Sequence, residues 1–380
     1  MRVAICGMGL RATHVLGLLS KHITDIKFVG FYDEGEASSD WQDGGDIPEY
    51  KTLNELLEAT APDLLFIGSP NHLHLEHIRA GLEAGVQIFC EKPVVTTIED
   101  TFVLAELLQK YGTDRVIIGL VLRYSQHVRD LEAALDAGHI GSISSIEASE
   151  YIAPFHGAFF MRDWRRHDKY SGGWMLEKCC HDLDIYNMVT KSRPKRVASF
   201  GGRRSFLPEH APAKGVDDSV YHVKESRWES QDDPFNVDGD VVDQQSAIIE
   251  YESGASMTFQ TNSNVPDEHR RFCVMGAKGM VEADFVRGYF KVTDALTSER
   301  LVEKEYANDQ GLLGTHWGAD ELMVEDVAAK LSGSNKELPV GVVDAMVAGI
   351  AALAIDEARK TGKIVDLTSI WEKFDSYNLR

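Results

Sequence analysis

The sequence predicts an α/β protein: an N-terminal doubly wound parallel sheet of the Rossmann type, then an α+β domain on an open, mainly antiparallel sheet. Two observations carry this prediction. In residues 1–122, short apolar strands alternate with helical segments, the pattern of a parallel sheet with crossover helices. In residues 123–380, several strand-like segments follow one another without helices between them, which favours antiparallel pairing. We therefore expect two domains with a boundary near residue 122.

The elements of the first domain follow from apolar runs closed by turn residues. Helix starts are marked by capping residues such as Thr97, with Asp100 three positions on. The predicted strands are Arg2 to Cys6, Ile26 to Tyr32, Asp63 to Gly68, Val86 to Cys90 and Val116 to Leu122. The predicted helices are Leu10 to Leu19, Thr52 to Ala59, His72 to Gly85 and Thr97 to Tyr111.

The turn after the first strand predicts a dinucleotide site. Its residues Gly7-Met8-Gly9-Leu10-Arg11-Ala12 form a G-x-G-x-x-A pattern, in which glycine lets a pyrophosphate approach the amides of a helix N-terminus. Alone, the pattern also fits a tight turn without a ligand. Asp33 ends the next strand, where a carboxylate binds ribose hydroxyls. Glu34 and Glu36 follow with no adjacent arginine, so we expect NAD rather than NADP as cofactor.

The run Val86-Gln87-Ile88-Phe89-Cys90-Glu91-Lys92-Pro93 is a buried strand that stops at a charged pair and a proline. Lys92 therefore lies at the carboxyl end of a strand, the edge at which open parallel sheets bind ligands. Lys92, with Glu91 beside it, is either an ordinary surface charge or a proton carrier placed over a ligand.

The second domain begins with a helix and then changes to strands. The predicted helices are His127 to Ala137, Gly172 to Asp184, one that opens at Thr315 to Asp320, and Val342 to Arg359. The predicted strands are Ile143 to Ala153, Lys195 to Gly202, Asp243 to Tyr251, Ala255 to Ser263, His269 to Gly276, Gly288 to Thr293 and Lys363 to Asp366. Residues 155–166 are predicted to form a loop of aromatic and arginine side chains suited to a polyol or sugar, or a packed surface loop. The polar residues 203–242 form a lid, an oligomer arm or a plain insertion.

In the predicted helix from Gly172 to Asp184, three polar residues share one face. Glu177, His181 and Asp184 are spaced at i, i+4 and i+7. Carboxylates beside an imidazole would tune and orient it for proton transfer near neutral pH. A solvated helix face with a chance histidine has the same spacing, so the pattern leaves both interpretations open.

Composition excludes several classes of function. The net charge of −21 disfavours nucleic-acid and membrane-surface binding, and no apolar run is long enough to span a bilayer. Five cysteines without a CxxC motif and an N-terminus without a signal-peptide core predict a reduced, cytoplasmic protein. His72, His74 and His77 lack the partners of a metal site, so we expect no metal.

Together these motifs resemble the glucose-fructose oxidoreductase / inositol dehydrogenase (Gfo/Idh/MocA) family over nearly the full length. The resemblance rests on four pieces: the glycine turn, Ser69-Pro70-Asn71-His72-Leu73-His74, the strand ending in Glu91-Lys92-Pro93, and the helix carrying Glu177, His181 and Asp184. It departs from the family where Glu177 stands in place of the usual aspartate, and at Lys178 and Cys179.

The resemblance implies NAD(P)-dependent hydride transfer to or from a secondary alcohol of a sugar, inositol or related polyol. Lys92 would orient the oxygen, His181 would be the acid/base, and Glu177 or Asp184 would aim the pair. The implied cofactor contacts are the glycine turn, Asp33, Ser69, Pro70, Asn71, His74, Glu91 and Lys92. Candidate substrate contacts are Lys92, Arg123, Tyr124, Trp164, Arg165, His181 and His316.

The same resemblance leaves two alternatives open. An NAD-dependent glycosidase would act by transient oxidation, and a regulator would bind NAD without catalysis. The implied partner is a small carbohydrate or polyol, and the open sheet implies a homodimer or homotetramer.

Overall fold

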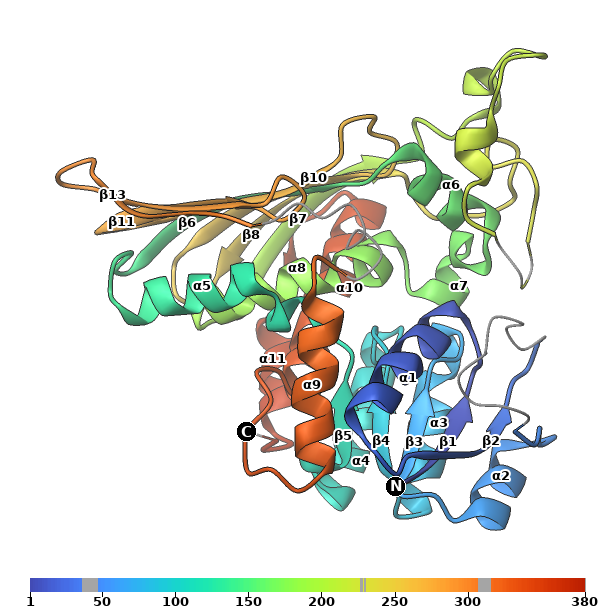
Figure 1. Ribbon diagram of the computed structural model, residues 1–380. Helices are drawn as coiled ribbons and strands as arrows, with labels where there is room; N and C mark the ends of the chain where they lie inside the picture. Colours follow the sequence, from blue (N-terminus) through green and yellow to red (C-terminus); the bar gives the residue numbers. More distant parts are fainter. Residues whose placement is uncertain (36–46, 226–227, 229, 307–315, 380) are drawn as a thin grey trace.

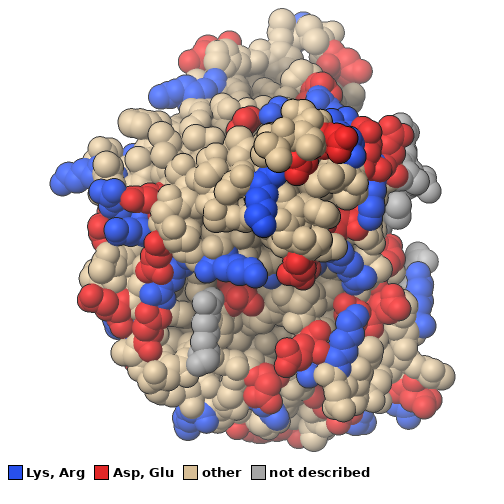
Figure 2. All heavy atoms as spheres, turned by 90° about the vertical axis from the view of Figure 1, so that its left-hand side faces the viewer, with Lys and Arg blue, Asp and Glu red and all other residues tan. Residues whose placement is uncertain are grey.

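The computed structural model describes residues 1–35, 47–225, 228, 230–306 and 316–379 of the chain. Two residues of the patterns above, Glu36 and Thr315, lie outside these ranges. Within them, no helix is long and apolar enough to cross a membrane. All five cysteines are unpaired and buried. On the face drawn in Figure 2, acidic and basic side chains are interspersed, with no continuous basic area.

The N-terminal part is a five-stranded parallel sheet in the order β2-β1-β3-β4-β5, which confirms the predicted Rossmann-type fold. Its inner strands are short and almost wholly buried, as expected when crossover helices cover both faces. The strands are β1 Arg2–Cys6, β2 Lys27–Tyr32, β3 Leu64–Ile67, β4 Gln87–Cys90 and β5 Val116–Ile118. The helices are α1 Leu10–His22, α2 Leu53–Thr60, α3 His74–Glu83 and α4 Ile98–Tyr111.

The register of this sheet brings three strand ends to one edge. Cys6 pairs with Ile67, and Ile67 pairs with Cys90. The residues that follow these strands in the chain therefore lie side by side. They are the glycine turn, the loop from Ser69, and the segment that begins at Glu91.

The C-terminal part is built on a nine-stranded sheet in the order β13-β12-β11-β10-β6-β9-β8-β7-β14. All neighbours are antiparallel except β6 and β9, which confirms an open, mainly antiparallel sheet. Figure 1 shows helices covering one of its faces only. The strands are β6 Ile143–Tyr151, β7 Pro194–Gly202, β8 Gln244–Tyr251, β9 Ser256–Asn262, β10 His269–Gly276, β11 Gly279–Asp284, β12 Tyr289–Asp294, β13 Arg300–Glu305 and β14 Val365–Asp366.

Two long helices lie between the sheets. α8 and α10 pack against each other, α10 against β7, and α10 also reaches α4 and β5. α9 packs on α1, so C-terminal helices contact the N-terminal part directly. The helices of this part are α5 Gln126–Asp136, α6 Pro154–Arg162, α7 Asp168–Ser171, α8 Trp174–Thr190, α9 Ala319–Leu331, α10 Val342–Thr361 and α11 Thr368–Asp375.

Three local predictions were wrong. The predicted loop at 155–166 contains helix α6, which begins with Pro154 at its first turn, where a proline needs no hydrogen-bond partner. The strand predicted to reach Leu122 ends at Ile118, and Val121–Tyr124 forms a 3-10 helix. The helix predicted from His72 is preceded by a 3-10 turn, Asn71–Leu73. The helix predicted to open at Thr315 to Asp320 is present as α9, which begins at Ala319.

Strands β11 and β13 were not predicted. β11 buries Gly279, Val281 and Ala283, whose small side chains give a weak alternating pattern. β13 is an edge strand whose side chains are mostly exposed, so its sequence lacks apolar alternation.

The insertion, residues 203–242, packs against α6. In its described part, Phe206 and Phe235 form a second apolar cluster with Phe160 and Met161 of α6. The Arg162 guanidinium of α6 donates hydrogen bonds to main-chain oxygens of the insertion, including that of Lys224 at 3.1 Å. Figure 1 shows this segment projecting past the end of the nine-stranded sheet.

Candidate active site

The glycine turn between β1 and α1 leaves room for a phosphate against its backbone. Gly7 has φ +87°, and a Cβ there would overlap the backbone nitrogen of Ser69. A Cβ at Gly9 would meet no atom within 4 Å. Gly9 precedes α1 and has no side chain to cap the first amides of that helix, and the first residue, Leu10, is exposed. Open amides at a helix N-terminus fit the pyrophosphate of a dinucleotide.

Asp33, at the end of β2, lies against this turn. Its Oδ2 accepts a hydrogen bond from the backbone N–H of Met8 at 2.6 Å, and its Oδ1 accepts one from Gly35 at 2.9 Å. These two bonds hold the carboxylate beside the glycine turn, the position expected for a ribose contact.

His74 holds two loops of this edge together. It is buried, and its ring nitrogens lie 2.7 Å from the carbonyl oxygen of Pro93 and 2.9 Å from that of Ser69. His77 contacts the Ser69 hydroxyl through Nδ1 at 2.9 Å. His74 and His77 both contact Ser69, one at its carbonyl oxygen and one at its hydroxyl, so they position the loop that begins there.

Lys92 reaches from the end of β4 to helix α8. Its Nζ donates a hydrogen bond to the main-chain oxygen of Glu177 at 2.7 Å and lies 3.6 Å from Glu177 Oε1. The preceding residue, Glu91, accepts a hydrogen bond from Arg11 Nε at 2.9 Å, and Arg11 Nη1 lies 2.7 Å from Asp320 Oδ1. Arg11 and Glu91 are therefore engaged with each other, while Lys92 points to the helix.

Glu177 is the centre of the site. Its carboxylate accepts hydrogen bonds from Asn71 Nδ2 and from Arg165 Nε, the latter at 2.8 Å. Burial raises the pKa of this carboxyl, but Lys92, Arg165 and Asn71 more than offset burial, so that the pKa lies below its ordinary value. Glu177 is thus an ionised carboxylate that joins the two sheets through Lys92 and Asn71.

His181 lies one helical turn after Glu177. Lys92 therefore reaches α8 one turn before His181, and its ammonium is near enough to act on the His181 ring. The ring centroid of His181 lies 6.0 Å from that of His316, whose Nδ1 is 3.0 Å from Asp320 Oδ2. Among the described residues, the buried Nδ1 of His181 has no hydrogen-bond partner.

The His181 imidazole is held neutral. Burial, and then the Lys92 ammonium, hold its pKa well below the ordinary histidine value. A neutral imidazole is able to accept a proton at neutral pH.

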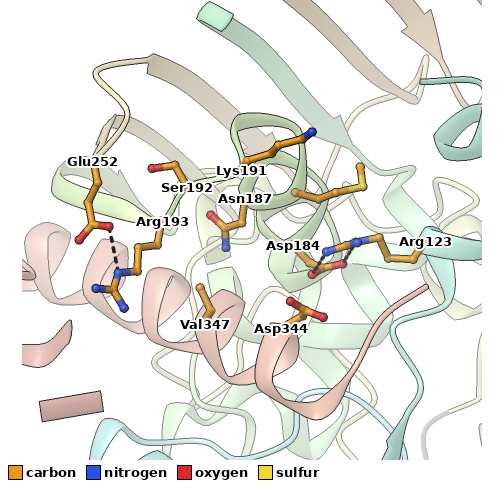
Figure 3. Close-up of a pocket in the computed structure, with 10 residues that line it drawn as sticks. Arg123, Asp184, Asn187, Lys191, Ser192, Arg193, Glu252, Asp344 and Val347 are labelled. Atoms are coloured by element: carbon orange, nitrogen blue, oxygen red, sulfur yellow. Dashed lines mark hydrogen bonds and ion pairs between the residues drawn. The ribbon is translucent and has the colours of Figure 1, made fainter. Parts of the chain in front are cut away.

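Asp184 lies two turns after Glu177 on α8 and has a partner of its own. Its carboxylate forms a two-point ion pair with Arg123, at 2.6 Å to Nε and 2.9 Å to Nη2. Burial raises the pKa of Asp184 to about 6, so it is ionised at neutral pH. Figure 3 shows the pair beside Asp344 in a cavity of about 450 Å³ that is not lined by Lys92 or His181. The structure therefore places Asp184 and Arg123 apart from the Lys92–His181 pair.

Of the remaining predicted substrate contacts, three lie near Lys92 and His181 and one does not. Tyr124 has no exposed surface and belongs to the core. Trp164 is buried, and the Arg165 guanidinium stacks on its ring with Cζ 4.2 Å from the centroid. Arg165 Nη1 also bonds Asp163 at 2.7 Å. Trp164, Arg165 and His316 thus gather with Glu177, Lys92 and His181, whereas Tyr124 does not.

Glu150 on β6 and Cys179 and Asp182 on α8 form a cluster of residue types that could bind a metal ion. Arg270 Nε bonds Asp182 at 2.9 Å, and both Arg270 Nη1 and Lys178 Nζ lie 3.2 Å from Glu150 Oε1. Two cations occupy the carboxylates that a metal would need. This described cluster is therefore an ion-pair network that fixes α8 to the large sheet.

Asn71, which is predicted to contact the cofactor, also donates a hydrogen bond to Glu177. The sequence patterns missed two other residues of this region. His156 and Lys224 come near the site from α6 and the insertion, and no spacing in the sequence links them to it.

Comparison with known families decides the classification. Residues 1–120 match the family described as "Oxidoreductase family, NAD-binding Rossmann fold", and residues 128–282 match the "GFO/IDH/MocA C-terminal domain". The chain belongs to the Gfo/Idh/MocA family. The expected family is thereby confirmed, along with the NAD-binding character of its first domain.

One relative by sequence and two solved structures show what this chain is similar to. The Bacillus subtilis (strain 168) protein YteT is 22% identical over 376 residues, which cover 86% of this chain and 88% of YteT. Scyllo-inositol dehydrogenase from Lactobacillus casei, solved with NAD(H) and scyllo-inositol, has a TM-score of 0.72 at 21% identity and covers 97% of this chain and 99% of its own. Levoglucosan dehydrogenase, solved with NADH and levoglucosan, has a TM-score of 0.73 at 17% identity with the same coverage of both chains. At these identities the structural likeness shows the fold.

Proposed function

We propose that this oxidoreductase transfers a hydride between a secondary alcohol of a sugar, inositol or related polyol and a nicotinamide cofactor. The observation that supports this most is that Lys92 reaches helix α8 at Glu177, one turn before His181. This point lies at the carboxyl end of β4, on the strand edge that also carries the glycine turn. Relatives that bind scyllo-inositol or levoglucosan with a nicotinamide cofactor share the fold.

The residues present fit a dinucleotide. Gly7 and Gly9 would bring the pyrophosphate to the start of α1, and Asp33 would hold the ribose hydroxyls. The carboxylate of Asp33 would repel a 2′-phosphate, so we assign NAD in preference to NADP. When bound, the cofactor supplies the hydride acceptor, and the chain supplies position and proton handling.

Proton transfer falls to His181. Because its ring is buried and neutral, it accepts the hydroxyl proton as the alcohol becomes a carbonyl, and it returns the proton in the reverse direction. Lys92 donates a hydrogen bond to the reacting oxygen and stabilises its developing negative charge. Glu177 fixes Lys92 and Arg165 from one buried carboxylate, so it acts as a positioning residue.

The open face of the large sheet suits a second copy of the chain. Phe200 on β7 and Ile248 on β8 are 75% and 61% exposed. Their strands are paired neighbours, and exposed apolar side chains of this size on adjacent strands mark an association surface. We assign a homodimer or homotetramer, and light scattering coupled to size-exclusion chromatography would test it.

The direct test is a screen of sugars, inositols and polyols for absorbance of reduced cofactor. Lys92→Ala and His181→Ala should each lower turnover by about 100-fold or more, since each removes a group that acts on the reacting oxygen. Binding of NAD, measured by fluorescence, should persist in both variants. Near-normal dehydrogenase rates in both would overturn the assignment.

The same screen distinguishes net oxidation of the substrate from a glycosidase that oxidises it only transiently. Reduced cofactor that accumulates in proportion to product indicates net oxidation. Cleavage of a glycoside without accumulation of reduced cofactor would instead indicate transient oxidation.

A further inference from the structure

Basic side chains gather around the candidate site of this strongly acidic chain. The chain carries a net charge of −21. Burial, and then the nearby Lys178, Lys224, His316 and Lys92, hold the pKa of His156 well below its ordinary value. These four neighbours come from α8, the insertion, the segment before α9 and the end of β4, so the cationic surroundings are assembled by the tertiary fold.

Lys92, Lys178 and the neighbouring Arg165 each form an ion pair with a carboxylate. Lys92 and Arg165 share Glu177, and Lys178 lies 3.2 Å from Glu150. Lys224 differs from them. It is half-buried, and among the residues that the structure describes no carboxylate forms an ion pair with its ammonium.

Aromatic rings, rather than acids, surround Lys224. Its Nζ lies 5.6 Å from the ring centroid of Phe155 and 5.7 Å from that of Phe159. Burial, and then Lys178 and Arg165, lower the pKa of Lys224 to about 8, while Glu268 acts in the opposite direction. Lys224 therefore stays mostly charged at neutral pH without a paired anion, an arrangement that costs free energy unless a ligand supplies one.

Lys224 is connected to the Lys92–His181 pair through one ring. The Arg165 guanidinium contacts the same Phe159, with Cζ 5.4 Å from the centroid. Arg165 then bonds Glu177, which holds Lys92. An anion at Lys224 would thus lie on the wall of the substrate region, across Phe159 and Arg165 from the reacting oxygen.

We infer that the substrate is a sugar acid, a polyhydroxylated compound whose single carboxylate is bound by Lys224 while its secondary alcohol reacts at Lys92 and His181. This inference rests on the proposed function. One unpaired lysine suits a monoanion, because a phosphate ester carries close to two charges at neutral pH. Phe155 and Phe159 provide apolar surface for the sugar ring beside the charge, as in other carbohydrate-sized sites.

The test compares matched acid and neutral sugars with NAD. D-glucuronate and D-galacturonate are measured against D-glucose and D-galactose, with glucose 6-phosphate as the third arm. The acids should have the higher kcat/KM. Lys224→Ala should lower the acid-to-neutral ratio of kcat/KM by about 10- to 100-fold, the loss expected for one hydrogen bond to a charged group. Lys224→Arg, which keeps the charge, should retain most of the ratio.

Lys214→Ala is the matched control, because Lys214 is an exposed lysine of the same insertion. It should leave the acid-to-neutral ratio at the wild-type value. Equal or better use of the neutral sugars, or an unchanged ratio in Lys224→Ala, would overturn the inference. A clear preference for glucose 6-phosphate over both uronates would overturn the choice of a carboxylate.

Equilibrium binding separates this inference from the proposed function. Calorimetry of the NADH-loaded protein with each uronate and each neutral sugar needs no turnover. Tighter uronate binding that Lys224→Ala removes, without any reduction of NAD by the panel, would support the inference and count against the proposed function. Turnover of neutral polyols together with no preference for uronates in binding would do the reverse.

Discussion

Replacement of Glu177 by glutamine tests the central ion pair of the site. The substitution keeps the size of the side chain and removes its charge, leaving Lys92 and Arg165 without their shared partner. At 3.6 Å, the attraction between Glu177 and Lys92 is worth about 1 kcal/mol in a water-like dielectric and about 5 kcal/mol at an effective dielectric constant of about 20. The Lys92 side chain keeps 21% of its surface exposed, so a value of about 2 kcal/mol is reasonable.

A loss of about 2 kcal/mol in the positioning of Lys92 corresponds to roughly a 30-fold decrease in kcat/KM. Initial rates of cofactor reduction, at saturating NAD and with a substrate from the polyol and sugar-acid screen, would measure it. Glu177→Asp is the matched variant, since it keeps the charge and introduces the residue usual in the family. It should recover most of the lost activity, and NAD binding should be unaffected in both variants.

Urea unfolding of both variants provides the control for stability. If Glu177→Gln folds normally and keeps wild-type kcat/KM, the carboxylate does not position Lys92. Equal impairment of the glutamine and aspartate variants, with both folded, would show that the length of the side chain matters and its charge does not.

Three further predictions concern other parts of the molecule. Asp33→Ser should raise the NADP-to-NAD ratio of kcat/KM by about 10- to 100-fold, because it removes repulsion of a 2′-phosphate; better use of NADP by the wild type would contradict this. Because burial and then Lys92 lower the pKa of His181, the acid limb of kcat/KM for oxidation should lie below pH 6.5, and Lys92→Gln should move it upward in the residual activity; a limb above pH 6.5 in the wild type would exclude His181 as the base. Asp184→Asn leaves the buried Arg123 unpaired and should destabilise the fold by about 3–5 kcal/mol in urea unfolding, while an unchanged midpoint would show that the pair is not structural.

The strand-helix alternation of residues 1–122 was sufficient to predict the parallel sheet. Buried parallel strands must be short apolar runs, and the crossover helices must be amphipathic, so both are visible in a local window. The same holds for the glycine turn and Lys92, because each follows directly after a strand and the ends of parallel strands share an edge. The open antiparallel sheet was also predicted, but not its edge strand β13, whose exposed side chains leave no alternating pattern.

Helix α8 shows why the site was predicted only in part. Spacing placed Glu177, His181 and Asp184 on one polar face, as for a helix with one side in water. The structure buries this helix on nearly all sides, so its polar residues need partners in several directions. Glu177 pairs with Arg165, Asp184 with Arg123, and Asp182 with Arg270.

The sequence by itself determined the fold class, the family, and the position of the glycine turn and Lys92 directly after their strands, because these depend on periodicities and motifs within a few positions of the chain. Only the tertiary structure decided which charges meet. Ion pairs form between side chains tens to hundreds of positions apart, and their partners depend on how helices and the insertion pack. Lys224 is the clearest case: its half-buried ammonium without a carboxylate partner among the described residues is visible only once the insertion lies against α6.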